Sequence, residues 1–182
     1  GNVGSDFVLN CWFEQDVSSS LPGSLVAEQI GGHWIVRALT EEDAVAKIGD
    51  TLYGSLVKAA SELKDGETLT LLRDYEGSQS VAVSADNAVI DLNGYSITNT
   101  AEGGYGINFS STYSTSGAGG SVSVINSGSG TSKITAATPL RVHSGNSQNL
   151  LPLTLGDNIE LECAGDAYSE LGTSACIEYS DA

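Results

Sequence analysis

Two short stretches near the end of the chain carry side chains that can transfer protons or bind a cation. In both stretches aliphatic residues alternate with polar ones, which is the pattern of a strand with one buried face. Arg141 and His143 would then point outward together from one strand. Glu160 and Glu162 would do the same from the other. If the two strands lie side by side, a base, an imidazole and two carboxylates share one patch, as acid–base catalysis or a calcium-assisted lyase requires.

The same four side chains have a second interpretation, a ladder of opposite charges between neighbouring strands. Such pairs stabilise a sheet by about 0.2–1 kcal/mol each and carry no chemistry. Arg141 and Glu160 are only 19 positions apart, which is short for a chain that returns to a neighbouring strand of the same sheet. The spacing therefore favours the charge ladder and a protein that is not an enzyme.

Metal sites have weak support in the sequence. His33 and His143 are the only histidines and show no metal-ligand spacing, so we expect no zinc site. Asp86 and Asp157 are each followed by asparagine and offer the oxygen ligands that Ca²⁺ prefers. Asp-Asn is equally typical of turns between strands. Turn chemistry is the preferred interpretation and calcium is the alternative; no other cofactor is indicated.

Tyrosines gather around a stretch rich in Gly, Ser and Thr that we expect to form a long loop. Tyr95, Tyr105 and Tyr113 would let planar rings stack on the apolar face of a sugar. The alternative is that these rings only pack the loop against the domain. A glycan is therefore one candidate ligand.

Two of the three cysteines lie close together near the end of the chain. Cys163 and Cys176 are 13 positions apart. A disulfide between them would remove loop entropy worth roughly 3 kcal/mol in an oxidising compartment. Two buried thiols are the alternative, since free cysteine behaves as a small apolar residue. An odd cysteine count leaves at least one thiol outside any such pair.

Charge and hydropathy exclude several classes of protein. The 182 residues include 7 Lys and Arg against 23 Asp and Glu, for a net charge of −16. Phosphates would be repelled, so nucleic acids and anionic bilayers are not expected partners. Hydrophobic residues make up 40% of the chain, which argues against wholesale disorder. No apolar run approaches the roughly 20 residues of a membrane span, so membrane insertion is not expected.

The elements that must position these groups change character at Gly66. Before it, the sequence predicts a hairpin over residues 45–53 and an amphipathic helix over 55–65, with Ser55 as its N-cap. After it, very short strands alternate apolar and polar residues between Gly, Ser, Asn and Asp. Many short strands at regular spacing indicate a sandwich, a barrel or a solenoid.

Internal similarity favours the solenoid. Residues 89–94 recur loosely as 123–128, and residues 86–92 recur as 157–161, which suggests repeats of roughly 24 residues. Asparagine at the corners would suit left-handed dihedrals and hydrogen-bond to the asparagine of the next repeat. The residues predicted to be buried in this arrangement are Leu56, Ala60, Leu63, Leu69, Leu71, Ile90, Leu92, Val124, Leu153, Leu155, Ile159 and Leu161.

Residues 45–74 and 89–98, with Asp65-Gly66-Glu67-Thr68-Leu69-Thr70-Leu71 and Ile90-Asp91-Leu92-Asn93-Gly94, resemble the opening of a known module. It is the right-handed parallel β-helix domain, pectin-lyase-like in fold, of surface proteins from gut Gram-positive bacteria. The resemblance implies an all-β solenoid over residues 45–182, with a hairpin and capping helix at 45–66 and coils over 67–182. Residues 1–44 would be an irregular N-terminal segment with short strands.

Two classes of function remain open from the sequence. The resemblance implies a secreted or cell-surface module of uncharacterised function, non-catalytic and adhesive, acting as a spacer or binding a glycan or a host protein. The alternative is a polysaccharide lyase or glycoside hydrolase on the same fold, because one fold serves many functions. For the C-terminal end of the stack we expect cover by residues 1–44, pairing with another molecule, or further coils.

Overall fold

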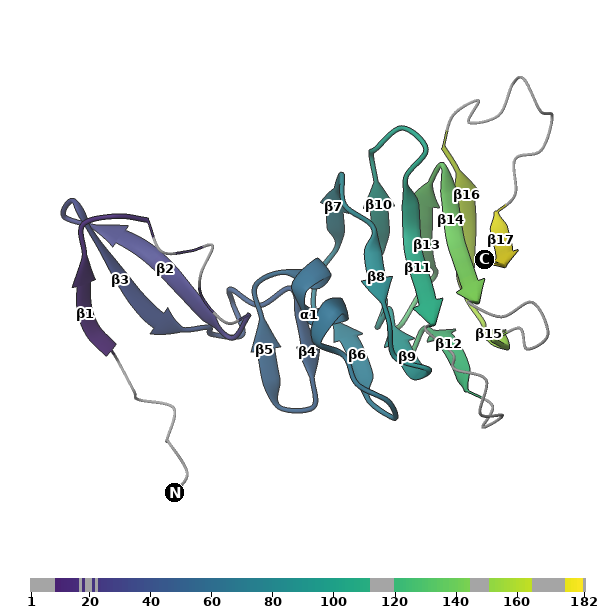
Figure 1. The fold of residues 1–182 in the computed structure, drawn as a ribbon, viewed down its shortest axis with the longest axis horizontal. Helices are drawn as coiled ribbons and strands as arrows, with labels where there is room; N and C mark the ends of the chain where they lie inside the picture. The colour runs from purple at the N-terminus through teal and green to yellow at the C-terminus, as the bar shows by residue number, and fades with distance from the viewer. Residues whose placement is uncertain are drawn as a thin grey trace.

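The structure is a computed structural model that describes residues 9–16, 18, 21, 23–111, 120–144, 151–164 and 176–181. These residues form seventeen strands and one helix. Along the longest axis of the molecule an N-terminal sheet comes first, the helix follows, and the remaining strands are stacked beyond it (Figure 1).

The N-terminal sheet has three antiparallel strands in the order β1-β3-β2. Its strands are β1 (Leu9–Phe13), β2 (Leu25–Ile30) and β3 (His33–Ala38). Arg37 on β3 donates to Asp43 at 2.6 Å and to Glu28 at 3.1 Å. The hydrogen bond from Arg37, helped by Thr40, holds the pKa of the Asp43 carboxyl well below its usual range. This ion pair joins the sheet to the turn that leads out of it.

A hairpin and the helix follow, close to where the sequence predicts them. β4 (Ala46–Ile48) and β5 (Thr51–Tyr53) pair antiparallel. The helix α1 spans Leu56–Glu62, and the Ser55 hydroxyl accepts from Lys58 N at 3.3 Å as the predicted N-cap. α1 ends before residue 65 because Leu63 is already extended. The helix packs against β4, β5, β6 and β8, at the start of the stacked strands.

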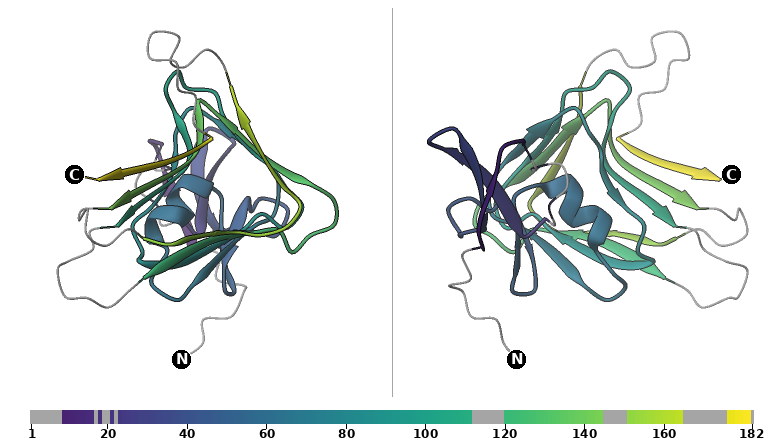
Figure 2. Two further views of the ribbon diagram at one scale, coloured as in Figure 1. Left: turned by 90° about the vertical axis from the view of Figure 1, so that its right-hand side faces the viewer. Right: turned by 60° about the vertical axis from the view of Figure 1, so that its left-hand side comes forward.

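The stacked strands form three sheets around one core (Figure 2). The first contains β6 (Thr68–Leu71), β9 (Asn87–Asp91), β12 (Ser121–Ile125) and β15 (Leu153–Leu155), with β4 and β5 added to β6. The second contains β7 (Tyr75–Gly77), β10 (Ile97–Asn99), β13 (Ser132–Ala136) and β16 (Ile159–Cys163). The third contains β8 (Val81–Val83), β11 (Tyr105–Ser111), β14 (Thr138–Ser144) and β17 (Ile177–Asp181).

The predicted fold class, a single right-handed parallel β-helix, is wrong. The described strands belong to four short sheets of different kinds. The N-terminal sheet is antiparallel, and the six-stranded sheet is mixed because β4 pairs antiparallel with β6. The separation along the sequence between paired residues is also unequal. Leu69 and its partner Ile90 are much closer in sequence than Ile90 and its next partner Val124. Alternation specifies which face of a strand is buried, but it specifies neither strand direction nor repeat length.

The apolar core lies inside the three stacked sheets. Leu69, Ile90 and Val124 are fully buried at matching register positions of β6, β9 and β12. Eight of the twelve residues predicted to be buried are buried: Leu56, Ala60, Leu63, Leu69, Leu71, Ile90, Leu92 and Val124. The other four, Leu153, Leu155, Ile159 and Leu161, keep exposed surface. They belong to β15 and β16, at the outer edges of their sheets, where no described strand covers them.

Asparagines occupy the corners of the stack, as the sequence predicts. Asn93 and Asn158 have positive φ values of 48° and 58°, which asparagine tolerates. Asn126 links neighbouring levels, because its Oδ1 accepts from Gly94 N at 2.8 Å and its Nδ2 donates to Asn158 O at 3.1 Å. Of these two bonds only the one to Asn158 joins two asparagines, and it reaches the backbone oxygen, so the predicted bond from asparagine to asparagine holds for one level only. At the same corner the buried Asp91 accepts from Ser127 N at 3.0 Å.

A buried serine on β13 is expected to destabilise the core. Ser132 is completely buried, and within the described structure its Oγ has no hydrogen-bond partner. Since an unpaired buried hydroxyl costs roughly 1–3 kcal/mol, we expect Ser132→Ala to raise the free energy of unfolding by about 1 kcal/mol. Urea unfolding measures the change. Ser123→Ala, on the outward face of β12, is the control and should have little effect; a destabilised Ser132→Ala would contradict the expectation.

Candidate functional site

Arg141 is the centre of a polar cluster on the outer face of the third sheet. Its Nε lies 3.2 Å from Glu178 Oε1 and donates to Ser180 Oγ at 3.2 Å. Its guanidinium carbon lies 4.7 Å from the centre of the Tyr105 ring, in cation–π geometry. Arg141 on β14 therefore contacts residues of both neighbouring strands, β11 and β17. These contacts hold the three strands together.

His143 shares one of these partners. Its Nδ1 lies 3.0 Å from Ser180 Oγ. The serine hydroxyl thus sits between the imidazole and the guanidinium of Arg141. A serine–histidine contact suggests a nucleophile and its base, but that chemistry also needs a group to orient the base and donors for an oxyanion. The contacts of this cluster instead tie β14 to the last strand, β17.

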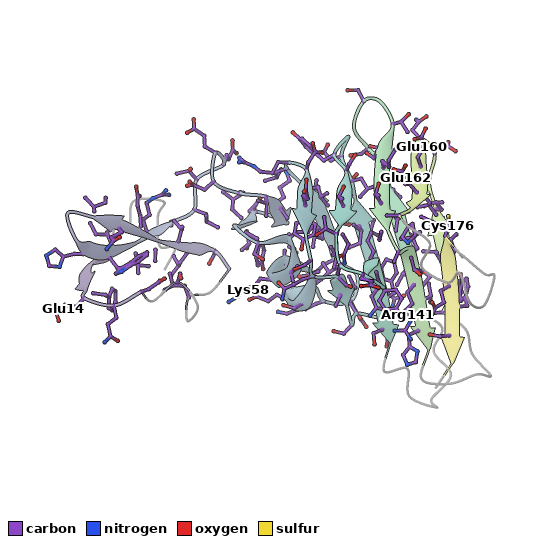
Figure 3. The ribbon with its side chains drawn as sticks, turned by 90° about the horizontal axis from the view of Figure 1, so that it is seen from above. Glu14, Lys58, Arg141, Glu160, Glu162 and Cys176 are labelled. Carbon is purple, nitrogen blue, oxygen red and sulfur yellow. The ribbon has the colours of Figure 1, made fainter. Side chains whose placement is uncertain are left out.

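Glu160 and Glu162 lie on a different sheet from Arg141 and His143. Both project from β16 toward Lys133 on β13, whose Nζ is 3.8 Å from Glu160 Oε2 and 3.3 Å from Glu162 Oε2. Hydrogen bonds from Thr135 and Lys133 lower the pKa of the Glu162 carboxyl. Figure 3 shows the glutamates on one side of the stack and Arg141 on the other.

The four candidate catalytic residues are thus divided into two cross-strand charge groups. Arg141 and His143 are together, and so are Glu160 and Glu162, as alternation predicts. The structure does not bring the two pairs into one patch. The ion pairs that it does form, Arg141 with Glu178 and Lys133 with the glutamates, match the charge-ladder interpretation.

The tyrosines do not form one platform among the described residues. Tyr95 packs against the hydrophobic core. Tyr105 presents its ring to the guanidinium of Arg141, so that ring face is already occupied. Tyr113 lies outside the described residues. A sugar-stacking surface therefore has no support from the two rings that the structure places.

Asp86 and Asp157 lie at opposite ends of strands in the first sheet. Asp86 directly precedes β9, whereas Asp157 follows β15. The register pairs β9 with β12 and β12 with β15, so the two aspartates lie at different corners. The described part of the chain contains no group of three or more His, Cys, Asp or Glu residues placed to hold a metal ion.

Cys163 and Cys176 are free thiols in the structure and lie side by side. Cys163 ends β16, and Cys176 directly precedes β17. Burial, together with a hydrogen bond and the charge of Cys176, raises the pKa of the Cys163 thiol to about 11. Both side chains keep some exposed surface, so they differ from the two buried thiols of the sequence alternative. The disulfide between them stays a prediction.

This raised pKa predicts slow alkylation of Cys163. In reduced protein at pH 8, we expect iodoacetamide to modify it about a hundredfold more slowly than in the urea-unfolded chain, because the thiolate is the reactive form. The rate should rise with pH up to about 11, the folded-state pKa. Peptide mass mapping identifies the modified site. Equal rates in folded and unfolded protein would contradict the prediction, and Cys176→Ser should speed the reaction.

A hollow of about 310 Å³ lies between β2 and the start of α1. Leu25, Val26 and Leu39 form part of its wall, with Lys58 as the charged group. The Lys58 ammonium already donates to Leu21 O at 2.6 Å. The hollow therefore has a partly apolar wall, and its lysine is already hydrogen-bonded to the backbone.

The last described strands of the three sheets form an apolar end that no other described strand covers, and we call it the terminal face. β15, β16 and β17 each stand last in their sheet, so each has one edge that no described strand pairs. Their inward positions continue the core but keep exposed surface, with Leu155 at 38%, Ile177 at 38% and Tyr179 at 47%. The terminal face consists of Leu153, Leu155, Ile159, Leu161, Ile177 and Tyr179.

Cover of this end by residues 1–44 is ruled out for the residues that the structure describes. β1, β2 and β3 lie at the opposite end of the long axis (Figure 1). The rim of the terminal face is acidic, with Glu160, Glu162 and Glu178 on its strands. No lysine or arginine follows Arg141 in the sequence. The face is thus apolar at its centre and negative around it.

Two further observations complete the description. Among the described helices, none is long and apolar enough to cross a membrane. Comparison of the chain with protein-family models, with curated proteins and with solved structures finds no match.

Proposed function

We propose that this chain is a non-catalytic, protein-binding module, and that it binds through the terminal face. The observation that supports binding is the exposed apolar surface of Leu155 on β15 and of Ile177 and Tyr179 on β17, beside strand edges that no described strand pairs. Exposed apolar patches bordered by polar residues are typical of protein interaction sites. The proposed setting, secreted or at the cell surface, rests on the resemblance of residues 45–74 and 89–98.

The polar clusters favour binding over catalysis. In the third sheet, Arg141 is held by Glu178 and Ser180 and covers Tyr105, and the second candidate, His143, contacts the same Ser180. The carboxylates Glu160 and Glu162 face Lys133 on another sheet. A lyase or hydrolase needs such groups around one substrate bond. The alternative enzyme class therefore has less support than a binding module.

The geometry also favours a protein partner over a glycan. Of the three tyrosines proposed for sugar stacking, Tyr95 packs against the core and Tyr105 packs under Arg141. The terminal face instead offers aliphatic surface and free backbone groups. Those features suit a polypeptide strand, which brings both apolar side chains and backbone donors and acceptors.

A displayed library of random twelve-residue peptides tests the binding function. Peptides are selected on the wild-type protein and then challenged with the double variant Ile177→Lys, Tyr179→Lys. We expect enriched peptides that lose binding to this variant, because two charges would break the apolar centre. Ile30→Lys is the matched control, since Ile30 is 51% exposed on β2 at the other end and should keep all binding. No enrichment, or equal binding to the double variant, would contradict the proposal.

An activity assay tests the non-catalytic part separately. The protein is incubated with polygalacturonate and with alginate in the presence of calcium, and unsaturated products are followed by absorbance. We expect no turnover. Turnover that is lost in Arg141→Ala would replace the binding module with a lyase.

A further inference from the structure

Building on the proposed function, we infer that the terminal face takes an extended strand in parallel on the free edge of β17, and that this strand carries a basic residue opposite Glu178. The partner is thus a segment of another protein in which aliphatic residues flank a lysine or arginine in alternation. Three independent features of β17 support this: its backbone edge, its inward side chains and its charge.

The backbone of β17 has one edge that is paired and one edge to which no described strand is bonded. It pairs parallel with β14 over five register positions, from Leu140 opposite Ile177 to Ser144 opposite Asp181. β17 stands last in the order β17-β14-β11-β8, so no described strand occupies its other edge. In a parallel ladder alternate residues bond to opposite neighbours, so half of the β17 amides and carbonyls point toward the free edge. Strand addition satisfies them.

The inward side chains of β17 select aliphatic residues in the partner. Ile177 and Tyr179 lie in register with Leu140 and Val142, which are buried. They are themselves 38% and 47% exposed, because no described layer lies beyond them. A strand with aliphatic residues at the two matching positions would bury this surface. Removal of this apolar area from water would favour the complex.

The charge of Glu178 favours a basic residue at the outward position of the partner strand. In the paired strands just before this edge, basic residues of β13 and β14 face acidic residues of β16 and β17. Lys133 faces Glu162, and Arg141 faces Glu178 at 3.2 Å. At the next edge the glutamates of β16 and β17 are presented to solvent, because no described strand lies beyond β16 or β17. A cation at the matching position of the partner would complement Glu178.

The same charges disfavour a second copy of this chain as the occupant. Two terminal faces that meet end to end would bring the Glu160, Glu162 and Glu178 side chains of one copy near those of the other. Like charges placed opposite one another across paired strands are destabilising. A basic strand avoids this repulsion and retains the apolar contact.

β14 itself supplies the probe, because it is the strand that already pairs with β17. A blocked, fluorescently labelled peptide with the sequence of residues 138–144 is titrated into the full chain, and anisotropy is measured. In the β14 register this peptide would place its leucine and valine beside Ile177 and Tyr179, with its arginine opposite Glu178. The comparison peptide has glutamate in place of the arginine.

We expect the arginine peptide to bind at least about tenfold more tightly than the glutamate peptide, since a charged hydrogen bond is worth about 1.4 kcal/mol or more. Glu178→Gln should remove most of that preference. Glu76→Gln, an exposed position on β7 in the first level of the stack, is the matched control and should keep it. Hydrogen exchange should show new protection at alternate amides of β17 in the complex.

Several results would overturn the inference. Equal affinity for the two peptides, a preference unchanged by Glu178→Gln, or protection confined to other strands would each exclude a basic strand on β17. Concentration-dependent dimerisation that the peptide cannot compete with would assign the face to a second copy. If the library yields binders that need Ile177 and Tyr179 while this peptide pair fails, the proposed function stands and only the strand-addition inference falls.

Discussion

Phe109→Ala is expected to lower the free energy of unfolding by about 3–5 kcal/mol, the usual cost of removing a buried aromatic ring. Phe109 is the largest completely buried side chain among the described residues and lies on β11 in the third sheet. Its neighbours in register are Val83 and Val142. These flanking strands hold the walls of the resulting cavity in place, so the cavity cannot close fully.

Urea unfolding followed by circular dichroism measures this change. Phe109→Leu should cost less than about 1.5 kcal/mol, because it retains most of the volume, and it remains measurable if the alanine variant does not fold. Phe13→Ala is the matched control, since Phe13 on β1 is 36% exposed. Equal losses for Phe109→Ala and Phe13→Ala would show that the core does not lie where the structure places it.

Gly128→Ala should be comparably damaging, by about 3 kcal/mol or more, through overpacking of two backbones. A Cβ on Gly128 would overlap the carbonyl carbon of Asn93 and the backbone nitrogen of Gly94. These are main-chain atoms of the neighbouring corner, so no flexible side chain can move aside. The methyl group would force apart the corner that Asp91 and Asn126 hold together.

Gly54→Ala is the control for this substitution. A Cβ there would meet Leu39 Cδ2 at 3.4 Å, an ordinary contact, and the change should stay under about 1 kcal/mol. Thermal or urea unfolding of both variants gives the comparison. A Gly128→Ala protein with wild-type stability would mean that the two corners are farther apart than described.

The local features of this fold are predictable from the sequence where they depend only on a short run of residues. Ser55 caps the helix, and alternation identifies the buried set around Ile90 and Val124. The repeat between residues 89–94 and 123–128 is confirmed, because Val89 pairs with Ser123 and Ile90 with Val124. In each case a local pattern is enough, since cap geometry and the two-residue period depend only on neighbours.

The global arrangement was predicted less well, for a physical reason. The second proposed repeat, residues 86–92 with 157–161, fails because Ile159 begins β16 in another sheet. Strands of all three sheets share the same alternation, so the sequence does not mark which sheet a strand joins. Direction is equally unmarked, as the antiparallel pairing of β4 with β6 shows.

The candidate site also has features that the sequence predicts and features that it does not. Alternation correctly places Arg141 and His143 on one face and Glu160 and Glu162 on another strand. It could not identify Tyr105 and Ser180 as the neighbours of Arg141, because those contacts depend on which strands pair. The acidic partner of Arg141 is Glu178, which no short-range pattern singles out.

The acidic side chains at the β17 end have a kinetic consequence. All seven lysines and arginines precede residue 142, whereas acids continue to residue 181. Glu160, Glu162 and Glu178 therefore give this end a local negative potential. A partner with the basic strand proposed above is attracted to this potential before contact, which accelerates productive encounter. Because the field is screened over about 8 Å at physiological ionic strength, added salt should slow association while leaving dissociation nearly unchanged.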